Sequence, residues 1–196
     1  MIENQNDGRT VDLGVAHGRF QVFHKDHLRY VLAAKQRCRH LLVGITSPDP
    51  ARAPLERTAP HRSNRDANPL TYYERMSMIS ACLEAEGLPA QSFSIVPFPI
   101  EFPEELSNYV PADAVHFLTV YDTWGDEKVA RLDRLGYRVE VLWRSTNKAM
   151  SGTQIRTAMA SGQAWQHLVP AASKRFLSTH GVLARLTPPP VGVPEG

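Results

Sequence analysis

The chain has 196 residues, 42% of them hydrophobic and 21% charged, which is enough for one domain with a substantial core. Its formal net charge of +2 is too small to indicate nucleic acid or a membrane surface as a partner. The amino-terminus is polar, and no stretch approaches the roughly 20 apolar residues of a membrane span, so we expect a cytoplasmic protein.

Apolar spacing and turn residues predict strands that alternate with helices along the chain. The expected strands lie at 11–20 (with the turn that follows), 40–46, 92–98, 114–120 and 137–143. The expected helices lie at 28–38, 71–86, 104–109, 125–136 and 151–162, followed by two short helical segments. Cys38 and Cys82 fall inside predicted helices without CxxC spacing, so we expect two reduced, buried thiols.

This alternation predicts right-handed crossovers between parallel strands. We therefore expect a single Rossmann-like α/β domain over 11–186, with a five-stranded parallel sheet and helices on both faces. Residues 1–10 and 187–196 are expected to be flexible tails. A sheet of this kind binds ligands at the carboxyl ends of its strands, where the strand order reverses.

Two segments carry residues suited to phosphate chemistry. The first is GRFQVFHKDHL (18–28), in which His24 and His27 are three residues apart and so face the same way on a first helical turn. The second is SGTQIR (151–156), where hydroxyls and backbone N–H groups at a helix start can bind anionic oxygen. Arg156 follows one turn later and can grip a phosphate through its planar fork.

Simpler interpretations exist for each of these features. His24 and His27 could be a zinc pair or ordinary surface histidines, but no cysteine or HExxH context completes a site, so no protein metal site is predicted. SGTQIR could be only a helix N-cap. The basic stretch 57–65 could be solvated surface, and Trp124 could serve packing alone.

The two segments resemble a known superfamily. GRFQVFHKDHL resembles the GRFQPxHxGH signature of the nucleotidyltransferases related to class I aminoacyl-tRNA synthetases, and MSGTQIR resembles their ISxTxxR signature. With NPLTYYER and WQHLVP, the arrangement is most similar to archaeal-type nicotinamide mononucleotide (NMN) adenylyltransferases. Cytidylyltransferases that act on small phosphates and phosphonates share the fold and the first motif. The resemblance implies an enzyme that joins a nucleotide to a phosphate- or phosphonate-bearing acceptor and releases pyrophosphate.

The resemblance also implies roles for individual residues. The catalytic residues are His24 and His27, at the α and β phosphates, and Arg156, at the leaving group. The nucleotide-binding residues are Gly18, Arg19, Phe20, Lys25, Asp26, Ser151, Gly152 and Thr153. The partners are a nucleoside triphosphate and a small anionic acceptor, for which the candidate contacts are Arg57, Arg62, Arg65, Asp122 and Trp124. A Mg²⁺ cofactor is expected on the triphosphate, bound mostly by phosphate and water.

Three departures from the family pattern leave the substrates open. Asp26 replaces the glycine between the histidines, Val22 replaces a proline, and the segment 101–110 has no tryptophan to stack nicotinamide. The nearest resemblance is to ATP:NMN adenylyltransferase, and the alternative is CTP-dependent transfer to a small phosphonate such as phosphonoformate. A nucleotide-binding regulator without catalysis is the third hypothesis, and a homo-oligomer is compatible with all three.

Overall fold

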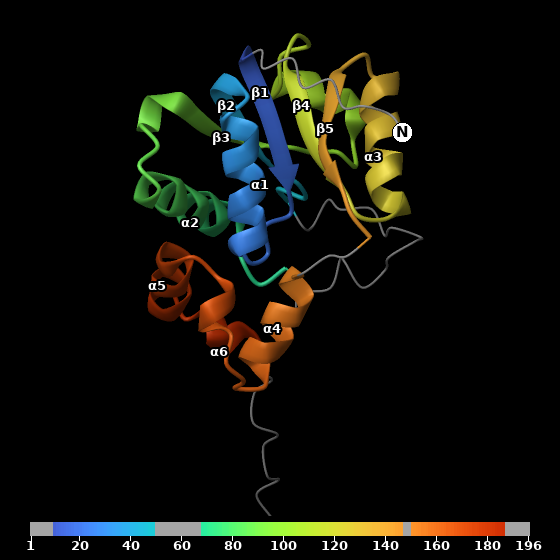
Figure 1. The fold of residues 1–196 in the computed structure, drawn as a ribbon. Coiled ribbons are helices and arrows are strands. Elements are labelled where there is room, and N and C mark those ends of the chain that lie inside the picture. The colour runs from blue at the N-terminus through green and yellow to red at the C-terminus, as the bar shows by residue number, and fades with distance from the viewer. Residues whose placement is uncertain (1–9, 50–67, 147–149, 187–196) are drawn as a thin grey trace, which may run out of the picture.

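The structure, a computed structural model, describes residues 10–49, 68–146 and 150–186. One parallel sheet with the strand order β3-β2-β1-β4-β5 forms its centre (Figure 1). The strands are β1 (Val11–Gly18), β2 (Cys38–Ile45), β3 (Phe93–Pro97), β4 (Val115–Val120) and β5 (Arg138–Arg144). The predicted five-stranded parallel sheet is confirmed.

Six α-helices and three short 3₁₀ helices connect and cover these strands in the described residues. The α-helices are α1 (Lys25–Lys35), α2 (Tyr72–Ala85), α3 (Thr123–Arg134), α4 (Gly152–Ala160), α5 (Ala171–Thr179) and α6 (Val182–Leu186). The 3₁₀ helices are η3 (Ala90–Ser92), η4 (Pro103–Asn108) and η5 (Gln166–Leu168). Capping boxes mark where two helices begin: Thr71 with Glu74 before α2, and Ser151 with Gln154 before α4.

Two apolar cores lie on the two faces of the sheet. Val15 and Ala16 are neighbours in β1 and point to opposite faces, so the central strand contributes to both cores. The Ala16 core packs against α1 and α2, and the Val15 core packs against α3 and η4. The predicted helices on both faces are confirmed, while α4, α5 and α6 lie beyond the carboxyl edge of the sheet (Figure 1).

The strand order reverses at β1, and this reversal positions the site. Val15 pairs with Leu42 of β2 on one side and with His116 of β4 on the other. Connections that leave neighbouring strands in opposite directions open a crevice at the carboxyl ends of those strands. Gly18, the last residue of β1, lies at this edge of the sheet, and α4 lies beyond the same edge (Figure 1).

One local prediction is corrected by the structure. Cys38 does not lie in a helix: α1 ends at Lys35, and Cys38 opens β2 opposite Val11 of β1. Pairing with β1 therefore overrides the helical pattern at this point. The short helix predicted at 104–109 is confirmed and is the 3₁₀ helix η4. Both thiols are free and buried, as predicted, and no helix in the described residues is long and apolar enough to cross a membrane.

Candidate active site

The turn between β1 and α1 is packed tightly against the helix that follows it. A Cβ at Gly18 would lie 2.8 Å from the ring of Phe20, so a side chain does not fit there without movement of that ring. Phe20 adopts a left-handed backbone (φ 52) and is fully buried. Its ring meets the ring of His27 edge-on, with the centroids 5.0 Å apart. Phe20 therefore lies in the core and supports His27 from the side.

The two histidines of the turn form a stacked pair. Their ring centroids are 3.6 Å apart with an interplanar angle of 18°. His24 is the N-cap of α1, and its Nδ1 accepts a hydrogen bond from the backbone N–H of His27 at 3.3 Å. Nδ1 of His27 lies 3.2 Å from the carbonyl oxygen of Val22, so it donates. Neutral His24 therefore carries its proton on Nε2, whereas neutral His27 carries its proton on Nδ1.

The first turn of α4 lies directly against this strand-to-helix turn. A Cβ at Gly152 would lie 2.6 Å from the backbone carbonyl oxygen of Gln21, so only glycine permits this approach. Nη1 of Arg156 donates to the same carbonyl, and its Nη2 donates to Oγ1 of Thr153 at 3.2 Å. The hydroxyl of Ser151 accepts from the backbone N–H of Gln154 at 3.2 Å and so caps the helix. The two motif segments, far apart in sequence, meet at one place.

Three guanidinium groups gather at this edge of the sheet. Burial lowers the pKa of Arg156 to about 10, and the charge of Arg19 acts in the same direction. Burial likewise lowers the pKa of Arg75 to about 10, again with Arg19 as a second cause. Since both values lie above neutral pH, Arg75 and Arg156 are cations there. A polyphosphate is the kind of ligand that compensates such a concentration of charge.

Side chains that sequence analysis missed hold the turn in place. The amide of Gln21 bonds both backbone groups of Leu70, at 2.7 Å to the carbonyl and at 2.9 Å from the N–H. The hydroxyl of Ser173 in α5 donates to the carbonyl of Phe23 at 2.9 Å. Gln21 belongs to the GRFQ motif, and that membership was the only signal for its importance. The contacts themselves span long sequence distances and leave no local pattern.

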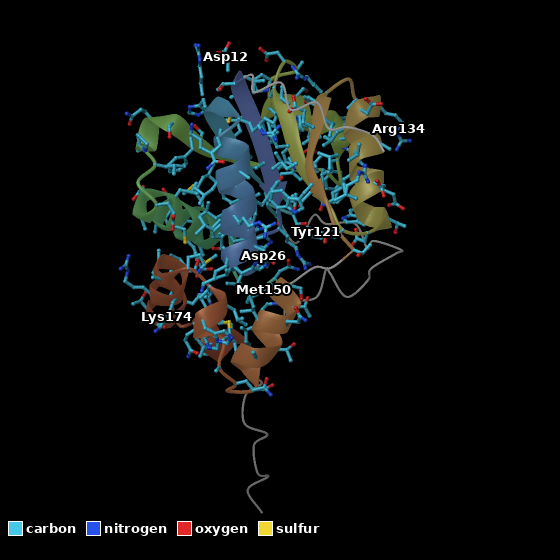
Figure 2. All side chains as sticks on the ribbon, viewed as in Figure 1. Asp12, Asp26, Tyr121, Arg134, Met150 and Lys174 are labelled. Atoms are coloured by element: carbon cyan, nitrogen blue, oxygen red, sulfur yellow. The ribbon has the colours of Figure 1, made fainter. Side chains whose placement is uncertain are left out.

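The remaining residues predicted to bind nucleotide or acceptor lie near the starts of α1 and α3, or outside the described residues. Lys25 is exposed at the first position of α1, and Asp26 is half-buried beside it. Figure 2 labels Asp26 in the first turn of α1, Met150 just before α4 and Tyr121 just after β4, all toward the carboxyl edge of the sheet. Asp122 and Trp124 lie at the start of α3. The three predicted acceptor contacts Arg57, Arg62 and Arg65 lie outside the described residues.

The contacts of the α3 residues are local ones. Oδ1 of Asp122 accepts from the backbone N–H of Gly125 at 2.9 Å and caps the helix. The guanidinium of Arg131 lies 5.6 Å from the ring centroid of Trp124, within range of a cation–π contact. Both residues thus have a structural role at the carboxyl end of β4, whatever else they contact.

Comparison with known proteins agrees with this geometry. The sequence model of the cytidylyltransferase-like family matches residues 15–158. The phosphonoformate cytidylyltransferase of Streptomyces viridochromogenes is 49% identical over 173 residues, which cover 88% of this chain and 94% of that protein. The nicotinamide-nucleotide adenylyltransferase of Thermococcus sibiricus is 31% identical over 166 residues, which cover 84% of this chain and 82% of that protein.

A solved structure shows the same fold at low sequence identity. The bifunctional NMN adenylyltransferase/ADP ribose pyrophosphatase of Francisella tularensis superposes with a TM-score of 0.66 at 17% identity. The match covers 89% of this chain and 52% of that one, so this chain spans about half the length of the bifunctional protein. From the family match, the 49% identical relative and the shared fold, the chain belongs to the cytidylyltransferase-like family and is a nucleotidyltransferase.

Proposed function

We propose that this enzyme transfers the cytidylyl group of CTP to a small phosphonate that also carries a carboxylate, of the phosphonoformate type. The observation that carries the proposal is the 49% identity over 88% of the chain with a phosphonoformate cytidylyltransferase, against 31% for an adenylyltransferase that acts on nicotinamide nucleotide. The cationic edge formed by Arg19, Arg75 and Arg156 supports it. A small acceptor with several negative charges suits such an edge.

In this reaction a phosphonate oxygen attacks the α-phosphorus of CTP. A new P–O bond forms, the bond from the α-phosphorus to the bridging oxygen of the β-phosphate breaks, and pyrophosphate leaves with the electron pair. No covalent enzyme intermediate is required, so catalysis consists of positioning and of neutralising charge. His24, with its proton on Nε2, can donate to a phosphate oxygen as a neutral group. His27 can donate from Nε2 only as an imidazolium, since its Nδ1 proton is held by Val22.

We propose that Mg²⁺ enters with the triphosphate. Among the residues that the structure describes, no three His, Cys, Asp or Glu side chains are grouped to hold a metal ion. Mg²⁺ usually keeps several waters and binds substrate phosphates together with one or two carboxylates, so an ion carried by the triphosphate does not need a protein cage. The bifunctional Francisella protein, 52% of which this chain covers, has been solved with AMP and a manganese ion. When bound, Mg²⁺ would neutralise the triphosphate, and Asp26 is the carboxylate nearest in sequence to the histidine pair.

A second candidate is adenylyl transfer from ATP to NMN. Its support is a set of relatives named nicotinamide-nucleotide adenylyltransferase, at 30–31% identity over most of this chain. Both reactions would proceed by attack of an acceptor oxygen on the α-phosphorus, release pyrophosphate and use the same motif residues. They differ only in the base and in the acceptor.

Pyrophosphate release distinguishes the candidates. The full chain is incubated with Mg²⁺ and each of the four nucleoside triphosphates, together with phosphonoformate, phosphonoacetate, NMN or inorganic phosphate. We expect the highest kcat/KM for CTP with phosphonoformate. Activity confined to ATP with NMN would establish the second candidate. Tight nucleotide binding without pyrophosphate release from any pair would indicate a regulator and reject both.

A further inference from the structure

Arg75 is a buried arginine whose hydrogen bonds, within the residues that the structure describes, all go to backbone carbonyls. Its side chain is fully buried in the first turn of α2, where a charged residue is normally paired with an opposite charge. Here Nε donates to the carbonyl of Thr71 at 3.3 Å, and Nη1 donates to the carbonyls of Arg19 at 3.0 Å and Thr46 at 2.8 Å. Nη2 donates to the carbonyl of Ser47 at 2.9 Å.

These four carbonyls belong to three separate segments that meet at the crevice. Arg19 follows β1, Thr46 and Ser47 follow β2, and Thr71 precedes α2. The backbone N–H of Thr46 donates to the carbonyl of Gly18 at 3.0 Å, and this is the point where the two strands separate. Ser47 adopts a left-handed backbone (φ 45), which a residue other than glycine rarely takes without support. The planar fork of Arg75 supplies that support.

A neutral side chain of similar volume would fill this space without the cost of burying a charge. Burial lowers the pKa of Arg75 to about 10, with Arg19 as the second cause, while Tyr72 and Glu101 act in the opposite direction, so the cation persists at neutral pH. A single amine could not satisfy carbonyls on three segments, because it lacks the five N–H groups in a fixed plane that arginine offers. Binding to the carbonyls of these three segments therefore depends on both the charge and the planar shape of the arginine side chain.

We infer that Arg75 is a positioning residue for nucleotidyl transfer. It holds the main chain of Arg19 and the end of β2 in one arrangement, so that the Arg19 side chain is directed to the substrate phosphates. It also places a second positive charge behind them. Arg75 acts through Arg19 and does not touch the substrate. The inference rests on the proposed function, because it assumes that this edge binds a triphosphate.

The test compares Arg75→Lys and Arg75→Ala with the wild type at a temperature where all are folded. Lysine keeps the charge but cannot bridge the three segments, so we expect KM for CTP to rise by about tenfold or more and kcat to fall. Millimolar methylguanidinium should restore part of the activity of Arg75→Ala, and ethylammonium at the same concentration should not. If Arg75→Ala does not fold, the lysine variant alone decides the outcome.

Arg185→Ala is the matched control. Arg185 bonds Glu74 at 2.6 and 2.8 Å and the carbonyl of Pro69 at 3.0 Å, at the same end of α2, without reaching the turn after β1. Its loss should lower Tm and leave kcat and KM unchanged. The same pattern in Arg75→Lys, a lower Tm with unchanged kinetics, would overturn the inference.

Hydrogen exchange without substrate separates this inference from the proposed function. We expect faster amide exchange in residues 18–23 and 44–49 of Arg75→Lys, and wild-type exchange there in Arg185→Ala. If the wild type uses another nucleotide and acceptor, the proposed function fails, and KM is measured with that pair instead. If exchange in these segments is unchanged in Arg75→Lys, the positioning role fails while the proposed function stands.

Discussion

His24 and His27 differ chemically although they stack on one another. The backbone N–H of His27 holds Nδ1 of His24 as an acceptor, while the carbonyl of Val22 holds Nδ1 of His27 as a donor. Toward a substrate, Nε2 of His24 can therefore donate from a neutral ring, whereas Nε2 of His27 can donate only from a charged ring. A site that must neutralise charge on a transferring phosphate has use for both.

We predict that His27→Ala lowers kcat for pyrophosphate release by about 100-fold or more, or about 3 kcal/mol, the effect of losing one transition-state donor. The fold should persist, because His27 is only half-buried and its removal leaves Phe20 and Phe23 in contact with each other. His167→Ala, at an exposed position, is the control and should retain wild-type kcat. Wild-type turnover in His27→Ala would remove this histidine from the mechanism.

Asp26 is the residue most relevant to substrate choice. It occupies the first turn of α1, half-buried, where the family pattern has glycine. A carboxylate there can accept a hydrogen bond from an amino group of cytosine or adenine, or from a ribose hydroxyl. Without such a partner, or a metal ion, its charge would repel the triphosphate.

We predict that Asp26→Gly stays folded but changes the ranking of CTP against ATP, or of phosphonoformate against NMN. The measurement is kcat/KM for each pair of substrates in both proteins. Ratios that all agree within about twofold, under about 0.4 kcal/mol, would show that Asp26 does not contribute to specificity.

At the scale of elements, the active site depends on how closely α4 approaches the turn after β1. In an open helix, a change from glycine to alanine stabilises by about 0.5–1 kcal/mol. At Gly152 the added Cβ would lie 2.6 Å from a backbone carbonyl oxygen, closer than such atoms normally come. Steric contact therefore outweighs helix propensity at this position.

We predict that Gly152→Ala displaces the start of α4, lowers Tm and reduces kcat by about tenfold or more, because a small misplacement of catalytic groups is costly. Thr157→Ala changes an exposed position of the same helix and is the control. Its Tm and kcat should match the wild type. An unchanged kcat in Gly152→Ala would show that the position of α4 does not limit the reaction.

Sequence patterns predict the elements of this fold better than the contacts between them. Capping residues such as Thr71 and Ser151 act within four positions, so their helix starts are visible in the sequence. The contacts of Arg75 and Gln21 reach 56 and 49 positions along the chain and depend on tertiary packing. Arg75 ends the NPLTYYER segment that carries part of the resemblance, but an arginine in a helical turn is normally solvated, so this pattern does not mark the side chain as buried. At Cys38 the local pattern predicts a helix, but pairing of β2 with β1 places this residue in a strand.

At the scale of the whole molecule, two histidines lie in the core on the α3 face of the sheet. His17 stacks on Phe98 with centroids 4.2 Å apart, and the ring of His116 lies 4.6 Å from that of Tyr137. Within the described part of the chain, their ring nitrogens have no hydrogen-bond partner. Burial lowers the pKa of His116 to about 4, and burial, with Lys128 as a second cause, lowers the pKa of His17 well below its usual value.

These shifts predict a loss of stability in mild acid. The folded protein keeps both rings neutral, whereas the unfolded chain binds protons near pH 6.5, so the free energy of unfolding falls as pH decreases below that value. Each histidine contributes a slope of about 1.4 kcal/mol per pH unit until the pH reaches its folded pKa. Urea denaturation between pH 7 and 5 measures the slope, and His116→Phe should reduce it. Equal slopes in both proteins would contradict this account.

The position of β1 in the sheet has a consequence for synthesis of the protein. β1 leaves the ribosome before the other four strands of the sheet. Its partner β2 follows within about 30 residues, but its other partner is β4, where His116 lies opposite Val15. At about 5–20 residues per second, roughly 5–20 s pass before that partner is made. During this interval the nascent chain presents the edge of a hydrophobic central strand, which is a template for pairing with other chains. When this enzyme is produced at high concentration, we therefore expect aggregation mainly before residue 120 is made. Slower initiation of translation or added chaperone should raise the soluble yield.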